Sequence, residues 1–266
     1  MNEFYYKNTN GLITLHCAPL DAYATHCFTT RKGGVSTGCC SETNLSFSRE
    51  DRETVLENYR RICAAEGFCM ERMTLTDQTH TDRVRLVEEA TAGMGMSKPS
   101  DIVDTDGLIT SLADTPLAVF VADCAPVLMA DKRSGAVAAV HSGWKGTLKG
   151  IAARALEQMH AAYGTRPEDV IAAVGPCIGG CCYEVGQDFK DAFGGKWEHL
   201  FTPKGEKYHF DLKEANRLVL QQAGVGEIHV TRECTRCKPD LLFSHRATSG
   251  KRGNMAGIIQ RKGDEQ

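Results

Sequence analysis

The sequence predicts an α/β protein in which mixed β-sheet layers are flanked by helices, and three observations lead to that prediction. Short apolar runs typical of buried strands alternate along the chain with stretches of helical periodicity. Of the 266 residues, 24% are charged and 42% are apolar, which is typical of a packed globular protein. No internal repeat, low-complexity tract or Pro/Ser-rich linker interrupts the chain, so we expect a single domain over residues 1–266.

The first predicted element is an amphipathic helix over residues 51–66, because its apolar side chains share one face and Gly67 follows it. Two apolar runs come next, at 117–121 and 126–130, and each is typical of a buried strand. A polar turn then leads into a strand of small side chains at 136–140.

The second half of the chain continues the alternation. Residues 148–163 have the clearest helical spacing, and residues 170–174 form a buried strand that a Gly-Pro pair ends. A helix is expected over 211–224, because Glu214 stands at capping-box spacing from its first residue. Residues 228–231 are predicted to form a late strand.

Charge and composition exclude several classes of partner. The net charge is −3 and no basic block is present, so no nucleic-acid partner is expected. No apolar stretch approaches the roughly 20 residues that a membrane helix needs, and the N-terminus lacks the pattern of a signal peptide. We therefore expect a cytoplasmic protein without a membrane partner, and nothing in the sequence indicates an oligomeric state. The twelve cysteines are then expected to be free thiols, most of them buried.

Three residues, His80, Cys124 and His141, lie at or near the ends of predicted strands. The polar pair Asp123-Cys124 interrupts an apolar run, where it costs free energy unless it is satisfied. Two imidazoles and one thiolate can hold a zinc ion with a fourth position open, as catalytic zinc sites do. The residues alone leave two alternatives open, which are satisfied buried polar groups and a metal-free pair in which His141 activates Cys124 as a nucleophile.

Three loops contain candidate contacts to a substrate or to phosphate. The loop that begins with Ser142 and Gly143 leads into a predicted helix, so its backbone amides form either an anion site or a plain turn. Arg31 lies in a glycine-containing loop, where it either binds phosphate or is solvated. His245 and Arg246 either face a substrate or lie at the surface.

Two cysteine-rich segments are less specific. The segment from Gly175 to Val185 holds three cysteines, for which a metal cluster is one interpretation and a close-packed turn that lines a pocket is the preferred one. Cys234 and Cys237 form a lone CxxC. Its assignment as a zinc half-site or a redox pair needs more context than the sequence offers.

Taken together, these stretches resemble the YfiH-like family, whose members are often described as laccase-domain or polyphenol oxidase proteins. The matching segments run in order from about residue 29 to residue 246, and they are TTRKGGVSTG, TNLSF, DQTHTDRV, DTDGLIT, ADCAPVLMAD, VAAVHSGWKGT, GPCIGGCCYEVG and LLFSHR. The resemblance implies a fold related to the catalytic domain of cytotoxic necrotising factor. It also implies a zinc ion held by His80, Cys124 and His141, and a purine nucleoside phosphorylase that deaminates adenosine as well.

The chain departs from the family pattern near its end. Members commonly continue the SHR segment with a second arginine and a later Gly-Arg, whereas Ala247 follows here and the later stretch reads Gly253-Asn254. No substrate contact is therefore carried over from these positions.

Three enzymatic functions are consistent with these residues. The resemblance favours a zinc enzyme that transfers ribose from a purine to phosphate, with adenosine, inosine and, for some members, methylthioadenosine as substrates. In deamination, zinc would lower the pKa of a water that attacks C6 of adenine. A copper oxidase of phenols is the second function, although nine histidines without a His-x-His pair argue against a multicopper centre. The third is a cysteine hydrolase or amidase in the editing of peptidoglycan precursors, with Cys124 as nucleophile. A non-enzymatic module that binds nucleosides is the remaining alternative.

Overall fold

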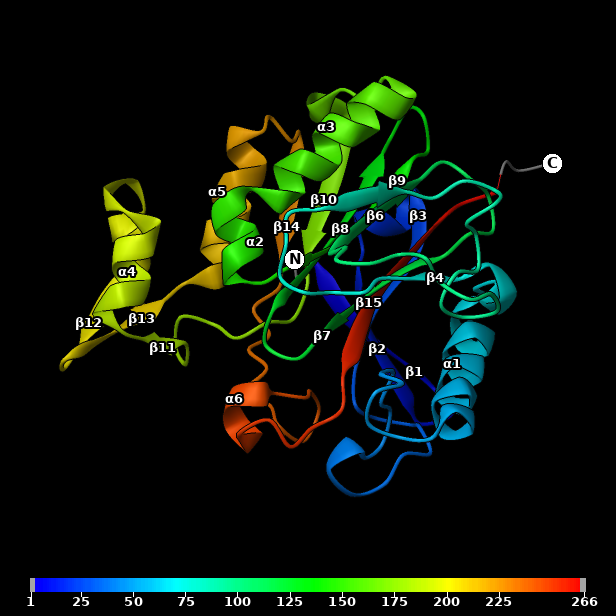
Figure 1. Cartoon of the computed structure of the whole chain (residues 1–266), viewed down its shortest axis with the longest axis horizontal. Helices are drawn as coiled ribbons and strands as arrows, with labels where there is room; N and C mark the ends of the chain where they lie inside the picture. The colour runs from blue at the N-terminus through cyan, green and yellow to red at the C-terminus, as the bar shows by residue number, and fades with distance from the viewer. Residues whose placement is uncertain (1–2, 264–266) are drawn as a thin grey trace.

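The computed structural model describes residues 3–263, and two six-stranded sheets stacked face to face lie at their centre (Figure 1). In spatial order, the first sheet consists of β1 (Phe4–Thr9), β2 (Leu12–Cys17), β3 (Ala24–Thr29), β15 (Met255–Arg261), β7 (Leu117–Val121) and β4 (Thr74–Leu75). The second consists of β14 (Glu227–Val230), β10 (Val170–Val174), β8 (Ala125–Asp131), β9 (Val137–Ser142), β6 (Gly107–Thr110) and β5 (Val84–Leu86).

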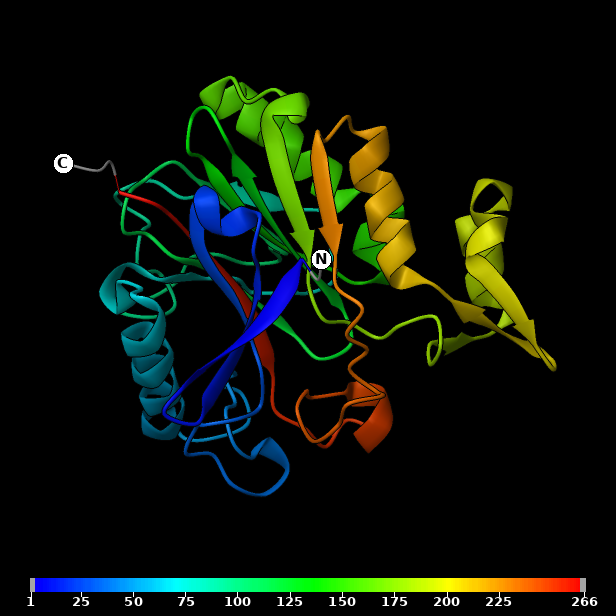
Figure 2. The same cartoon turned by 180° about the vertical axis from the view of Figure 1, so that it is seen from behind.

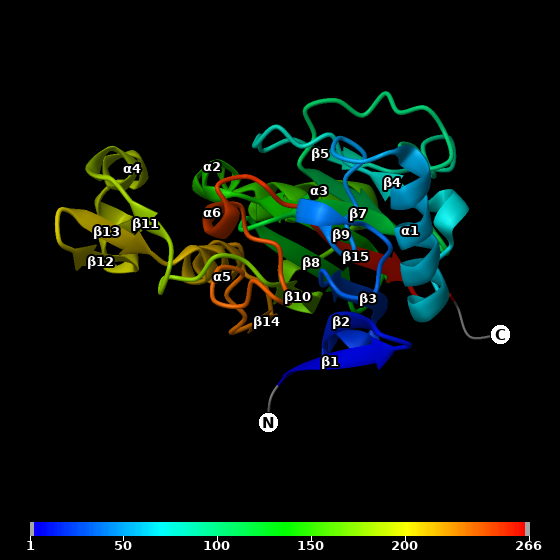
Figure 3. The same ribbon diagram turned by 90° about the horizontal axis from the view of Figure 1, so that it is seen from below.

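Helices and a small third sheet complete the described part of the chain. The α-helices are α1 (Arg52–Glu66), α2 (Trp144–Lys149), α3 (Ile151–Tyr163), α4 (Gln187–Phe193), α5 (Leu212–Gln222) and α6 (His245–Thr248). Short 3-10 helices lie at Leu20–Ala22, Gly38–Cys40, Met70–Arg72, Pro167–Asp169 and Gly195–Leu200. The third sheet has the order β11 (Glu184–Val185), β13 (Lys207–Phe210) and β12 (Phe201–Lys204), and with α4 it projects from the rest of the molecule (Figure 3).

Three apolar cores explain why these layers stack. The core between the two sheets contains Phe28 and Val119 from the first sheet and Leu128 and Ile171 from the second. The outer face of the second sheet is covered by α3 and α5, and the outer face of the first sheet by α1 (Figure 2). The central strands of both sheets are therefore buried on both faces, whereas the edge strand β1 is partly exposed. Burial on both faces accounts for strands that read as continuous apolar runs in the sequence.

Two loops cross from the first sheet to the second. The loop between β4 and β5 is one of them, and the short turn between β7 and β8 is the other. The red strand β15 lies between β3 and β7 in Figure 1 and is antiparallel to both. Parallel pairs, such as β10 with β14, occur beside antiparallel ones, so both large sheets are mixed, as predicted.

The predicted helices at 51–66 and 211–224 are confirmed as α1 and α5, and an aspartate caps the beginning of each. The carboxylate of Asp51 accepts a hydrogen bond from the backbone N–H of Thr54, and that of Asp211 accepts one from Glu214. The carboxylate of Glu214 does not close the capping box, because it pairs with Arg217 at 2.6 Å. Such an N-cap stabilises a helix by about 1 kcal/mol.

The prediction of one helix over residues 148–163 was wrong at its beginning. Helix α2 begins earlier, at Trp144, and a separate helix α3 begins at Ile151. Gly150 stands between them with φ 75°, and its N–H donates to the carbonyls of Gly146 and Thr147. A left-handed glycine ends a helix in this way without steric cost, so apolar spacing that continues across it does not reveal the break.

The predicted strands are all present. Residues 117–121 and 170–174 are confirmed as β7 and β10, and 126–130 lies within β8. The strand predicted at 136–140, with His141 at its end, is β9, which begins one residue later and continues through Ser142. Pairing of His141 with Pro126 of β8 extends the strand. The last strand, predicted at 228–231, is β14 and begins and ends one residue earlier.

None of the helices formed by residues 3–263 has both the length and the apolar character that a membrane crossing requires. A cytoplasmic location stays a prediction. All twelve cysteines are free thiols, and half of them are buried, so the expectation that most would be buried was too high.

Candidate metal and substrate site

The three residues expected to share a metal converge at the edge where the β4–β5 loop and the β7–β8 turn cross between the two sheets. His80 lies in the loop between β4 and β5, Cys124 in the turn between β7 and β8, and His141 in β9. Their ligand atoms all lie within 4.8 Å of one another. The Nε2 atom of His80 is 3.8 Å from the Sγ atom of Cys124, and the two imidazole rings are 5.0 Å apart at 80°. Two imidazoles and one thiolate therefore face a common point.

One carboxylate, that of Asp106, organises both histidines. Its Oδ1 atom is 2.7 Å from Nδ1 of His141 and accepts a hydrogen bond from the backbone N–H of His80. Its Oδ2 atom accepts hydrogen bonds from the N–H groups of Thr79 and Thr81 and from the hydroxyl of Thr81. Because Asp106 occupies Nδ1, the Nε2 atom of His141 is left for a ligand.

The backbone around the site is held by side chains that bridge loops. The amide of Gln78 donates to the carbonyl of Phe120 at 2.8 Å and accepts from its N–H at 2.6 Å, which docks the His80 loop on the edge of β7. His80 and Asp123 both have left-handed backbones, with φ 65° and 94°. Conformations of this kind persist only where surrounding contacts enforce them.

The carboxylate of Asp123 points away from the metal ligands and anchors two distant loops. It accepts hydrogen bonds from the hydroxyl of Thr235 and from the backbone N–H of Arg246. The carbonyl of Asp123 accepts a third, from the N–H of Ile178 at 2.9 Å. These contacts give Asp123 the role of positioning the neighbouring Cys124.

Space at the site depends on a glycine. A Cβ atom on Gly143 would lie 2.9 Å from the ring of His80 and 3.0 Å from the sulfur of Cys124, closer than carbon tolerates. The adjacent Ser142 is fully buried, and its hydroxyl is 3.0 Å from that of Thr147. The Ser142–Gly143 pair therefore packs against the ligands and begins α2.

Electrostatics favour a thiolate at Cys124. Burial opposes this, but the charge of His141 and the hydrogen bonds from both histidines hold the pKa of Cys124 below its usual value. Burial would lower the pKa of His141, but the Cys124 thiolate and the Asp106 carboxylate raise it. The pKa of Asp106 falls to about 2 despite its burial, because His141 and Thr81 stabilise its charge. A thiolate is the form that binds a metal ion.

A cavity of about 700 Å³ opens in front of the three ligands. Phe47 and Phe120 line it together with Arg252 and Asn254. Two buried polar atoms here have no hydrogen-bond partner among residues 3–263, namely Nε of Arg252 and Oδ1 of Asn254. Burial also lowers the pKa of the Arg252 guanidinium. Unsatisfied buried polar atoms are costly, so they indicate a place for a polar ligand.

The other predicted contacts lie outside that cavity. The guanidinium of Arg31 donates to the backbone carbonyls of Ser41 and Pro239, so it ties loops together. The Arg246 side chain donates to the carbonyl of Glu184. His245 is exposed, and its Nδ1 atom is 3.5 Å from Nη2 of Arg252.

Sequence reasoning missed two side chains that the structure places at the site. Asp106 lies in the segment DTDGLIT, and that family match was the available signal, but no role followed from it. Arg252 carries no local pattern, because it reaches the cavity through a loop that only the folded chain brings there.

Comparisons with known proteins show the family to which the chain belongs. A family model described as multi-copper polyphenol oxidoreductase laccase matches residues 25–262. The chain belongs to this laccase family. A purine nucleoside phosphorylase of Deinococcus radiodurans is 39% identical over 238 residues, which cover 88% of each chain. Purine nucleoside phosphorylase YlmD of Geobacillus stearothermophilus is 35% identical over 275 residues, which cover 98% of each.

Solved structures of the laccase family confirm the fold. The crystal structure of the hypothetical protein YfiH of Bacillus licheniformis has a TM-score of 0.90 to this chain at 32% identity, covering 97% of this chain and 99% of that one. The resemblance to the YfiH-like family and a mixed α/β, single-domain fold are therefore confirmed. The relation to cytotoxic necrotising factor stays a prediction.

Proposed function

We propose that this chain is a zinc-dependent purine nucleoside phosphorylase that also deaminates adenosine. The observation that carries the proposal is the convergence of His80, Cys124 and His141 on a cavity that contains unsatisfied polar groups. Relatives described as purine nucleoside phosphorylases, similar along most of the chain, support the same substrates, a purine nucleoside and phosphate.

The donor set suits a catalytic zinc. One thiolate and two imidazoles would fill three positions of a tetrahedron and leave the fourth for a reactant. A zinc ion there would supply a Lewis acid and would lower the pKa of water for the deamination. The carboxylate of Asp106 holds His141 in the orientation that presents Nε2 to that point.

The cavity supplies recognition of the two substrates. A volume of about 700 Å³ suits a nucleoside together with phosphate. Phe47 and Phe120 offer aromatic surface to the purine, and the guanidinium of Arg252 would donate to a phosphate oxygen. Asn254 has a free polar atom for a base or ribose group. In phosphorolysis, phosphate attacks C1′ of the ribose and the purine leaves.

Arg31 is not assigned to phosphate in this proposal, because backbone carbonyls already occupy its donors. His245 is placed close to Arg252 and would orient it. Arg246 and the Ser142–Gly143 pair would shape the loops around the ligands, through Asp123 and through close packing respectively.

Incubation of zinc-loaded protein with adenosine, with and without phosphate, tests the proposal. Adenine and ribose 1-phosphate that form only with phosphate mark the phosphorylase, and inosine marks the deaminase. A Cys124→Ala variant should lose both activities and the zinc held at His80 and His141, whereas Cys39→Ala, at an exposed cysteine outside the site, should keep them. Absence of product from a protein that carries zinc at the site contradicts the proposal.

Copper is the alternative cofactor, because imidazole and thiolate suit both metals. Its chemistry would make the chain an oxidase of phenols, as the family's description suggests. Metal analysis of protein purified from a medium that contains both metals distinguishes them. Copper in place of zinc, with oxidation of a phenol and no turnover of adenosine, favours the oxidase.

One observation favours a cysteine-dependent hydrolase or amidase instead. The lowered pKa of Cys124 and the raised pKa of His141 describe a thiolate–imidazolium pair, which is also the form of an activated nucleophile. Loss of one equivalent of zinc per chain in the Cys124→Ala variant would exclude the metal-free enzyme.

A further inference from the structure

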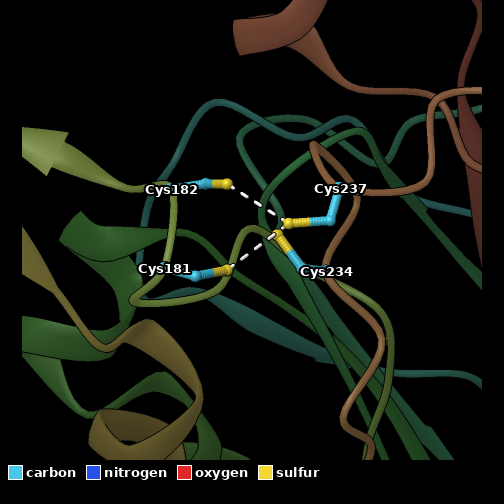
Figure 4. A group of neighbouring side chains, drawn as sticks. All are labelled: Cys181, Cys182, Cys234 and Cys237. Carbon is cyan, nitrogen blue, oxygen red and sulfur yellow. Dashed lines mark hydrogen bonds between the residues drawn. The ribbon is translucent and has the colours of Figure 1, made fainter.

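Four cysteines from two distant segments of the chain meet outside the candidate active site. We call them the tetracysteine cluster, and its members are Cys181, Cys182, Cys234 and Cys237. The first two lie between β10 and β11, and the other two between β14 and α6. Figure 4 shows that all four side chains point toward a common centre, and the four sulfurs lie within 4.8 Å of one another.

The sulfur positions fit a metal better than a disulfide. The Sγ atom of Cys237 is 3.6 Å from that of Cys181 and 3.4 Å from that of Cys182. Four sulfurs at about 2.3 Å from a zinc ion form a tetrahedron with edges of about 3.8 Å, close to these separations. Disulfide sulfurs are bonded at about 2.05 Å, so none of these pairs is a disulfide.

The backbone holds the two segments in place independently of the sulfurs. Cys177 and Cys234 form a parallel β-bridge, and the N–H of Thr235 donates to the carbonyl of Cys177 at 3.1 Å. Gly179 lies so close to the other segment that a Cβ atom on it would be 3.4 Å from the Cβ atom of Cys234. The cluster is therefore part of a close-packed junction between loops.

Backbone amides support a negatively charged sulfur in the cluster. The N–H of Gly179 donates to the Sγ atom of Cys234 at 3.3 Å. A backbone N–H that donates to a sulfur stabilises the thiolate, which is the form that binds a metal ion.

We propose that the tetracysteine cluster binds one zinc ion in a closed structural site, separate from the metal site at His80. Four soft thiolates select zinc among the common divalent cations, and a set of four leaves no open position for a reactant. The chain contributes two cysteines from each segment, so the ion would join the two loops directly.

Such a zinc ion would also position the candidate active site. Thr235 lies inside the CxxC segment, and its hydroxyl donates to the carboxylate of Asp123. Ile178, from the other loop, donates its N–H to the carbonyl of the same residue. The cluster thereby fixes both loops that hold Asp123 in its left-handed conformation beside Cys124. It is a positioning element and takes no part in the chemistry.

Zinc analysis of the full-length protein tests the proposal without reference to activity. A His80→Ala/Cys124→Ala variant should retain one zinc per chain, because the tetracysteine cluster is intact. Introducing Cys181→Ser/Cys237→Ser into this double-alanine variant should remove that zinc. Introducing Cys39→Ser/Cys69→Ser instead, a control pair outside the cluster, should leave the zinc bound. Absence of zinc from the first variant, or equal zinc in the two cysteine variants, overturns the proposal.

A second measurement covers the case in which the serine variant does not fold. In the His80→Ala/Cys124→Ala protein, a strong chelator should increase the number of thiols that react with a disulfide reagent by four, and added zinc should reverse this. Cobalt in place of zinc should produce sulfur-to-metal charge-transfer absorption of a tetrahedral thiolate site. Thiol reactivity that zinc does not change, an iron–sulfur spectrum, or a Cys182–Cys237 disulfide found by mass spectrometry contradicts the site.

Discussion

At the scale of single residues, Asp106 links the two histidines of the candidate site. Its carboxylate accepts from three consecutive backbone N–H groups, including that of His80, and contacts His141 at 2.7 Å. One side chain therefore fixes the position of one imidazole and the tautomer of the other. Neither effect requires Asp106 to touch the metal.

Substitution Asp106→Asn tests this role, because it keeps the shape and removes the charge. We expect the affinity for zinc to fall by about 10- to 100-fold, since the carboxylate no longer orients His141. Competition with a coloured chelator measures this affinity. Asp104→Asn, at a nearby exposed carboxylate that contacts Thr79, should leave the affinity unchanged. An affinity equal to that of the unmodified protein would show that Asp106 is not needed.

Arg252 should separate the two proposed reactions, because only phosphorolysis needs phosphate. Removal of a charge-assisted hydrogen bond costs about 1.5–3 kcal/mol, so Arg252→Met should lower kcat/KM for phosphate by roughly 10- to 100-fold. Deamination of adenosine should change far less. Lys251→Met, at the exposed neighbouring residue, serves as the control. An equal loss of both activities would mean that Arg252 does not bind phosphate.

The sequence predicted His80, Cys124 and His141 because each stands out against an apolar strand or its end. Their convergence is confirmed, whereas their roles stay predictions. Arg252 and Asp106 could not be assigned, because their importance arises from contacts between segments far apart in the chain. Arg31 has a guanidinium that can bind phosphate. The local sequence does not show that this guanidinium donates its hydrogen bonds to the carbonyls of Ser41 and Pro239 instead.

At the scale of elements, Gly150 separates two helices that periodicity joins. Gly150 has φ 75° and is the cap residue of both helices, at the end of α2 and at the beginning of α3. The apolar positions stay in phase across the break, so a pattern based on 3.6-residue spacing sees one helix. Backbone conformation, which that pattern does not contain, decides the boundary.

A Gly150→Ala substitution should destabilise the protein by about 1–2 kcal/mol, because a side chain disfavours the left-handed conformation. Urea unfolding followed by circular dichroism measures the change. Gly195→Ala is the matched control, since that glycine has no positive φ and open space around its Cβ position. Equal stability of the two variants would show that the backbone at 150 relaxes without cost.

At the scale of the whole molecule, a buried carboxylate joins α1 to the first sheet. Glu66, at the end of α1, accepts hydrogen bonds from Lys7 of β1 and Thr14 of β2. Burial opposes its charge, but His16, Lys7 and Thr14 lower the pKa of Glu66 from 4.5 to about 2. The packing of α1 on the first sheet is therefore stabilised by the ionised side chain of Glu66.

Acid should loosen this layer. A pKa lowered in the folded state stabilises the protein above the unfolded value, near 4.5, and the contribution is lost as pH falls toward 2. The free energy of unfolding should drop by about 3 kcal/mol over that range, and Glu66→Gln should remove this part of the dependence. Urea titrations at several pH values measure it. The exposed Glu53→Gln is the control, and a variant at Glu66 with unchanged pH dependence contradicts the assignment.

The alternation of apolar runs predicted the α/β class and most elements, because the central strands of each sheet are buried on both faces. The pairing of strands could not be predicted, since it depends on which faces meet in space. The position of β15 between β3 and β7 and the projecting third sheet are examples. The meeting of the two cysteine segments could not be predicted for the same reason, because each half alone is consistent with a turn or a lone CxxC.

The place of β15 has a consequence for biosynthesis. Within the first sheet, β15 joins the N-terminal strands β1–β3 to β7 and β4. Cys27 of β3 pairs with Ile258 of β15, so β3 is translated long before the strand with which it pairs. Arg252 and Asn254 directly precede β15 and reach the cavity with it. The first sheet and the cavity therefore both need the last strand of the chain, and neither is complete until residues 252–261 have been translated.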